Sequence, residues 1–137
     1  MKEQLKVSVF IQASSDRVWK GLTDPELVKQ YFFGTKVVSS WKEGSPIFFR
    51  GEWEGKPYED KGTILSIRPG SHVSYNYWSS MSGEADRPEN YNVIAYDLLP
   101  KENGTEVTVT QETTLEKKEH SEGNWRMILG GLKKLME

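Results

Sequence analysis

The 137-residue chain contains no cysteine, which excludes disulfides, thiolate zinc sites and cysteine nucleophiles. It also has no apolar run of membrane-spanning length, and its N-terminus lacks the apolar stretch of a signal peptide. Basic residues form no large patch, because 18 Lys and Arg are mixed with 20 Asp and Glu along the chain. We therefore expect a soluble, cytoplasmic protein that binds neither nucleic acid nor membrane.

Motifs of reactive chemistry are scarce as well. There is no Gly-x-Ser-x-Gly elbow to carry a serine nucleophile, and His72 and His120 are not in metal-ligand spacing. The sequence thus predicts no catalytic residue, no metal and no cofactor. It also shows no repeat, linker or low-complexity tract, so we expect a single domain over residues 1–137.

What the chain does have is aromatic residues, which make up 12% of it and include five Trp. Large rings either fill cores or line ligand cavities. Most of these rings fall in short segments where apolar and polar residues alternate, the pattern of half-buried strands. We predict seven such strands, at residues 5–12, 35–41, 47–53, 58–68, 72–78, 91–99 and 105–113.

Two short helices are predicted after the first strand, one capped by Ser14 and one by Asp24 followed by Pro25. A longer helix ends the chain, because apolar residues recur there at helical spacing. A single helix with one apolar stripe needs a sheet to cover it. The sequence therefore predicts an α+β fold in which a curved antiparallel sheet of about seven strands wraps around the C-terminal helix, with an apolar hollow between the two layers. The stripe consists of Trp125, Ile128, Leu129, Leu132, Leu135 and Met136.

Four strings of residues, taken together, resemble one family. They are residues 18–26 (VWKGLTDPE), Gly51-Glu52-Trp53 with Asp60-Lys61-Gly62, Gly104-Thr105, and Asn124-Trp125 with Leu129 and Leu132-Lys133. They are similar to homologues of the activator of the ninety-kilodalton heat-shock chaperone ATPase. That family belongs to the START-like, or SRPBCC, helix-grip superfamily, which also holds the birch-pollen allergen and the polyketide cyclases.

The resemblance implies a helix-grip fold built around a hydrophobic cavity that holds sterols, lipids, hormones or aromatic polyketides in other members. The co-chaperone that gives the family its name binds its chaperone through a separate N-terminal domain. These 137 residues contain no counterpart of that domain, so we expect no stimulation of a chaperone ATPase.

The leading hypothesis is a non-catalytic protein that binds a hydrophobic or aromatic small molecule between the sheet and the C-terminal helix. Tyr31, Phe32 and Phe33 would form the cavity mouth, or alternatively a hydrophobic plug. The lining is predicted from strand and helix phase, although ordinary core packing would give the same pattern. The predicted lining residues are Phe49, Trp53, Tyr75, Tyr77, Ile94, Tyr96, Gln111, Trp125, Leu129 and Leu132.

Two other functions remain open. One is a protein-interaction module of the chaperone-activator type, and the other is a cyclase-like or hydrolase-like enzyme. An enzyme would need a carboxylate that faces the cavity, and Asp60 and Glu52 are the candidates. We expect both to face solvent or to pair with a neighbouring Lys or Arg.

Gly130 and Gly131 lie inside the predicted C-terminal helix, where each glycine costs roughly 1 kcal/mol relative to alanine. Two explanations are equally consistent with the sequence. The missing side chains either make room for a ligand or let a strand approach closely, or they lie on a crowded or kinked face of the helix.

Overall fold

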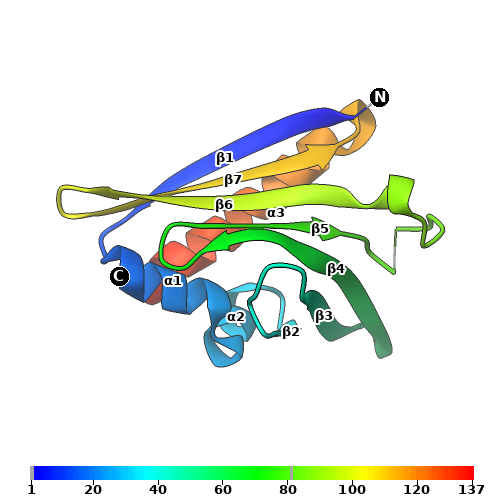
Figure 1. The fold of residues 1–137 in the computed structure, drawn as a ribbon, viewed down its shortest axis with the longest axis horizontal. Coiled ribbons are helices and arrows are strands. Elements are labelled where there is room, and N and C mark those ends of the chain that lie inside the picture. Colours follow the sequence, from blue (N-terminus) through cyan, green and yellow to red (C-terminus); the bar gives the residue numbers. More distant parts are fainter. Residues whose placement is uncertain (1, 81) are drawn as a thin grey trace.

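The computed structural model describes residues 2–80 and 82–137, apart from the side chain of Trp53. Seven antiparallel strands form one sheet in the order β1-β7-β6-β5-β4-β3-β2. Figure 1 shows this sheet curving across the long helix α3, with α1 and α2 at the end where α3 finishes. The predicted α+β helix-grip architecture is confirmed. The strands are β1 (Glu3–Ile11), β2 (Lys36–Ser39), β3 (Pro46–Trp53), β4 (Lys56–Arg68), β5 (His72–Tyr77), β6 (Asn92–Lys101) and β7 (Gly104–Thr113).

The two short helices begin where the sequence predicts. In α1 (Ser15–Thr23) the side chain of Ser14 accepts a hydrogen bond from the Arg17 amide at 3.2 Å. In α2 (Pro25–Tyr31) the Asp24 carboxylate accepts one from the Glu26 amide at 2.9 Å, and proline occupies the first turn. Each cap satisfies a backbone amide that the helix itself leaves without a partner.

The C-terminal helix α3 (Leu115–Met136) is longer than its apolar stripe. Thr114 caps it by accepting a hydrogen bond from the Lys117 amide at 3.3 Å. The first two turns carry mostly polar residues, and Leu115 is 73% exposed. Hydrophobic periodicity therefore reveals only the part of the helix that is packed, which starts near Trp125.

The core lies between the concave face of the sheet and the C-terminal half of α3. Alternate residues of each strand point to this side, because successive side chains of a strand face opposite ways. Leu129 and Leu132 of α3 pack here and are 1% and 0% exposed. The buried strand residues on the same side include Leu5, Val7, Ile11, Ile47, Ile64, Val73, Leu98, Val107 and Val109.

The two helix glycines differ in their surroundings. A Cβ added to Gly131 would lie 2.9 Å from the Cβ of Tyr31, whereas one added to Gly130 would meet nothing within 4 Å. Gly131 therefore permits α2 and α3 to approach closely, and Gly130 lies on the exposed face of the helix. Neither residue is among the described residues that line the two cavities of about 540 and 20 Å³.

Strand β4 links the two halves of the sheet. Its first part pairs with β3 up to Thr63, and its last part, from Ile64, pairs with β5. The register shifts between Ile64 and Ser66 at a β-bulge. A bulge bends a strand and reverses which residues face inward beyond it. Accordingly Ile64 is buried on the concave side and Leu65 is exposed, while Ile67 again packs against the core.

Candidate ligand cavity

A cavity of about 540 Å³ lies between the N-terminal half of α3 and the strands β3 to β7. The segment between α2 and β2 closes one side of it. This volume is within the roughly 300–1,000 Å³ typical of small-molecule sites. The lining residues are Phe32, Phe33, Thr35, Phe49, Tyr58, Asp60, Tyr75, Tyr77, Ser79, Ile94, Gln111, His120, Ser121, Asn124, Trp125 and Ile128.

Aromatic rings make up much of the wall, and Phe49 on β3 lies at their centre. Its ring centroid is 5.5 Å from that of Tyr77, 5.7 Å from Tyr75 and 6.0 Å from Phe32. Phe32 in turn meets Trp125 of α3 edge to face at 6.3 Å. Edge-to-face and offset contacts of this kind hold rings in fixed orientations. The cavity is thus bounded by a connected aromatic cluster rather than by isolated rings.

Three polar pairs are set into this wall. The hydroxyls of Thr35 and Tyr58 are 2.7 Å apart, and the Trp125 indole donates to Gln111 Oε1 at 2.5 Å. On α3, the Asn124 amide lies 3.3 Å from the imidazole of His120, which is exposed. The Oε1 atom of Gln111 is thus engaged by the Trp125 indole. Polar groups buried in apolar surroundings require such partners.

The expectation for Asp60 is wrong. Its side chain is on the concave face, where the residue is 6% exposed and lines the cavity. Oδ2 accepts a hydrogen bond from the Tyr77 hydroxyl at 2.5 Å, and Oδ1 accepts from the amide and hydroxyl of Ser80 at 2.9 and 3.2 Å. Glu52, in contrast, is exposed.

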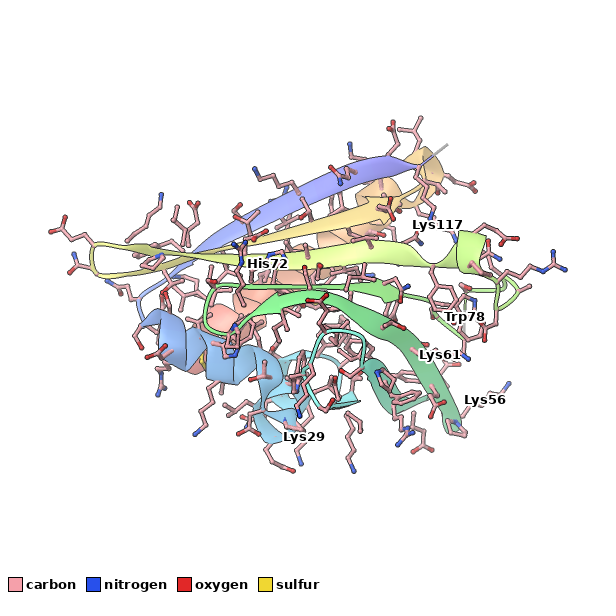
Figure 2. The ribbon with its side chains drawn as sticks, in the orientation of Figure 1. Lys29, Lys56, Lys61, His72, Trp78 and Lys117 are labelled. Atoms are coloured by element: carbon pink, nitrogen blue, oxygen red, sulfur yellow. The ribbon has the colours of Figure 1, made fainter. Side chains whose placement is uncertain are left out.

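No Lys, Arg or His in the described parts of the chain forms an ion pair with Asp60. The adjacent Lys61 points to the other face of β4, where its Nζ lies 2.6 Å from Asp86 and 5.7 Å from the ring centre of Trp78. Figure 2 shows Lys61 and Trp78 next to each other there. Within residues 2–80 and 82–137, the donors that hold the carboxylate are therefore all neutral.

Tyr75 and Tyr77, which line the cavity, stay protonated because their pKa values are raised. Burial raises the pKa of the Tyr77 hydroxyl far above its usual value, and the negative charge of Asp60 raises it further. Burial likewise raises the pKa of Tyr75, and that of Tyr96 behind it. A phenol that stays protonated can donate a hydrogen bond. Tyr77 therefore presents a neutral hydroxyl to the Asp60 carboxylate, which accepts that bond.

The structure brings together a majority of the residues predicted to line the cavity. Tyr31 and Tyr96 are next to a separate void of about 20 Å³. Leu129 and Leu132 lie in the packed core, because the C-terminal half of α3 packs directly against the sheet and the other helices. The side chain of Trp53 lies outside the described part of the structure. The predicted residues that do line the large cavity are Phe49, Tyr75, Tyr77, Ile94, Gln111 and Trp125, together with Phe32 and Phe33 from the predicted mouth.

Sequence reasoning missed the inward face of the first half of β4. Tyr58 and Asp60 share a face with Ile64, which is buried, and that spacing was the available signal. The signal was ambiguous because Ile64, Leu65 and Ile67 follow one another in the sequence and the bulge reverses the phase among them. The polar residues His120, Ser121 and Asn124 were missed because they precede the apolar stripe of α3.

Two further results concern the described residues. None of the helices in residues 2–80 and 82–137 is long and apolar enough to cross a membrane. The same residues contain no group of three or more His, Asp or Glu side chains placed to hold a metal ion.

A seven-stranded antiparallel sheet folded over a long C-terminal helix, with a cavity between them, defines a helix-grip protein of the SRPBCC type. The particular family follows from the sequence. Residues 12–137 match the family model described as "Activator of Hsp90 ATPase homolog 1-like protein", and the chain belongs to that family. No curated protein sequence matches the chain significantly.

Solved structures agree with this assignment. The solution structure of ChR145 from Cytophaga hutchinsonii is 46% identical, with a TM-score of 0.83 over 96% of this chain and 92% of that one. CalU16 from Micromonospora echinospora is 18% identical, with a TM-score of 0.79 over 99% of this chain and 77% of its own. CV1439 from Chromobacterium violaceum is 17% identical, with a TM-score of 0.78 over 98% and 96%. The last two show the shared fold.

Proposed function

We propose that this protein binds an apolar or aromatic small molecule in the cavity between α3 and the sheet. The observation that carries the proposal is the aromatic cluster around Phe49, which borders about 540 Å³ of space together with a few fixed polar groups. Small-molecule sites have this composition, in which apolar walls supply affinity and a few polar groups supply orientation.

The proposal is tested by filling the cavity. Ser121 lines it from α3 and is half-buried, so a Ser121→Trp side chain should occupy the space of a ligand. The matched control is Met127→Trp, because Met127 is 63% exposed on the same helix and does not line the cavity. A panel of neutral aromatic and apolar compounds is screened through the thermal midpoint and tryptophan emission.

A binding compound at 100 times its Kd should stabilise the wild type and the control by roughly 2.7 kcal/mol. The Ser121→Trp variant should fold and show no such stabilisation. A panel without any hit on the wild type contradicts the proposal. Equal binding to all three proteins contradicts the location of the site.

The buried Asp60 favours a second candidate function, acid–base catalysis on the bound molecule. In this case Asp60 would take a proton from an acidic C–H of a ketone and leave the electron pair on the resulting enolate. The proton on the carboxyl group would exchange with the solvent, and Asp60 would then deliver a solvent-derived proton or deuteron to carbon. This candidate predicts that the protein speeds deuterium exchange at the methylene of phenylacetone in heavy water, followed by NMR. It also predicts that Asp60→Asn abolishes the effect while Glu52→Gln retains it. Exchange at the buffer rate removes this candidate and leaves the binding protein.

A further inference from the structure

Among the residues that the structure describes, the donors to Asp60 leave one acceptor position of its carboxylate unused. A carboxylate offers about four lone-pair positions, two on each oxygen. In the described structure Ser80 occupies Oδ1 with two donors, its amide and its hydroxyl, whereas Oδ2 accepts from Tyr77 alone. Both Asp60 and Tyr77 line the cavity. A donor group of a bound molecule can therefore reach the remaining position on Oδ2.

The charge of Asp60 is also unbalanced. The described residues that line the cavity include no Lys and no Arg, and the one imidazole among them belongs to His120, which is exposed. Lys61, the nearest cation in sequence, is held on the opposite face by Asp86. Taking an isolated carboxylate out of water is costly, and a cation beside it offsets that cost. The negative electrostatic potential near Asp60 thus favours a cationic ligand group in this part of the cavity and disfavours an anionic one.

The surrounding rings suit the same kind of group. Tyr77 contacts Phe49 edge to face at 5.5 Å, and both line the cavity around Asp60. Aromatic faces attract organic cations through their quadrupole, most strongly where water is excluded. A carboxylate next to aromatic rings is therefore a combination that selects an ammonium group attached to an apolar body.

We infer that the ligand is an aromatic or apolar amine whose protonated nitrogen donates a hydrogen bond to Asp60 Oδ2 while its apolar body packs against the cluster around Phe49. This inference rests on the proposed function and narrows it to one chemical class. It also excludes fatty acids and other carboxylates as preferred ligands, because their charge would lie beside that of Asp60.

The test compares three probes with one apolar body: naphthylethylamine, naphthylethanol and naphthylacetate. Their Kd values are measured by isothermal titration calorimetry near neutral pH. Charge-assisted hydrogen bonds are stronger than neutral ones, so the amine should bind the wild type about ten-fold more tightly than the alcohol. Naphthylacetate should bind most weakly of the three.

Asp60→Asn should bring the amine and the alcohol to within about two-fold of each other, because the amide keeps the shape and loses the charge. Glu52→Gln is the matched control, since it removes the same charge from an exposed position and should leave the wild-type ratio unchanged. Binding of the alcohol to Asp60→Asn shows that the variant is folded. If Asp60→Asn does not fold, NMR contacts between the amine's methylene protons and the Tyr77 ring in the wild type decide the position of the ammonium group.

The outcomes separate the two proposals. A ten-fold preference for the amine that disappears in Asp60→Asn and persists in Glu52→Gln supports the inference. Equal binding of the three probes to the wild type, or a preference that survives in Asp60→Asn, overturns the inference and leaves the proposed function standing. In the wild type, methylene contacts to residues away from Tyr77 overturn it as well. If none of the probes binds and the wider panel also fails, the proposed function fails and the inference fails with it.

Discussion

Replacing Gly62 with alanine should lower the free energy of unfolding by about 3 kcal/mol, the upper end of the usual cost of overpacking, because no space is available for the added methyl group. A Cβ at Gly62 would overlap the backbone carbonyl oxygen of Asn76 on β5. Backbone in the middle of a sheet cannot move aside as the end of a flexible side chain can. The Thr63 amide also donates to the Asn76 side chain at 2.7 Å, so a shift of β5 breaks a second contact.

The measurement is the thermal midpoint, which should fall by about 10 °C for a domain of this size. Gly123→Ala is the matched control, because Gly123 is exposed in α3 and an added Cβ there meets nothing within 4 Å. That variant should be as stable as the wild type or slightly more stable. A thermal midpoint of Gly62→Ala within about 2 °C of the wild-type value would contradict the close approach of β4 and β5 at Gly62.

The same substitution should also damage the cavity. Gly62 is two residues from Asp60 on β4, and Asn76 precedes Tyr77 on β5. The close approach of the two strands is what sets the Tyr77 hydroxyl against the Asp60 carboxylate. Folded Gly62→Ala protein, if any is recovered, should therefore bind cavity ligands more weakly than the wild type.

Replacing Leu132 with alanine should cost about 2–5 kcal/mol of unfolding free energy, the range seen for buried leucines. Leu132 is 0% exposed in α3 and its side chain reaches Gly21 of α1. Removing it leaves a hole between the helix and the core, and neighbouring groups close such holes only in part. Met127→Ala is the control on the same helix, because Met127 is 63% exposed and its loss should change stability by no more than about 0.5 kcal/mol.

This pair of variants also separates packing from binding. Leu132 does not line the large cavity, so the Kd of any cavity ligand should stay within about two-fold of the wild type in Leu132→Ala, measured well below its melting temperature. Denaturant unfolding gives the stability change. A loss below about 1 kcal/mol, or a marked change in Kd, would contradict the division of α3 into a packed half and a half that covers the cavity.

Elements whose signals are local could be predicted from the sequence. Ser14 and Asp24 cap their helices because a side-chain oxygen needs only the amides two or three residues ahead of it. Alternation along β1 and β7 identifies their buried faces, since the strands are regular and their apolar residues recur at every second position. These residues are Leu5, Val7, Val9 and Ile11 in β1 and Val107 and Val109 in β7. The family could be recognised for a related reason, because its shared strings lie at such caps, turns and packed positions.

The candidate site could be predicted only in part. Phe49, Tyr75 and Tyr77 lie on clearly phased strands, and their inward direction followed from that phase. The neighbouring strand β4 carries mixed residues on both faces before its bulge, so its phase was undefined. Leu129 and Trp125 belong to one helical stripe, yet one is in the core and the other borders the cavity.

By itself, then, the sequence determined the order of the elements, the helix-grip architecture and the aromatic character of the space under α3. Each of these depends on residues near one another in the chain. The tertiary structure alone decided that Asp60 faces the cavity, that its partners are Tyr77 and Ser80, and that the C-terminal part of α3 is closed off as core. The physical reason is that a cavity is the space left where several elements fail to meet, and its position depends on the bend of β4 and the angle of α3, which no single segment encodes.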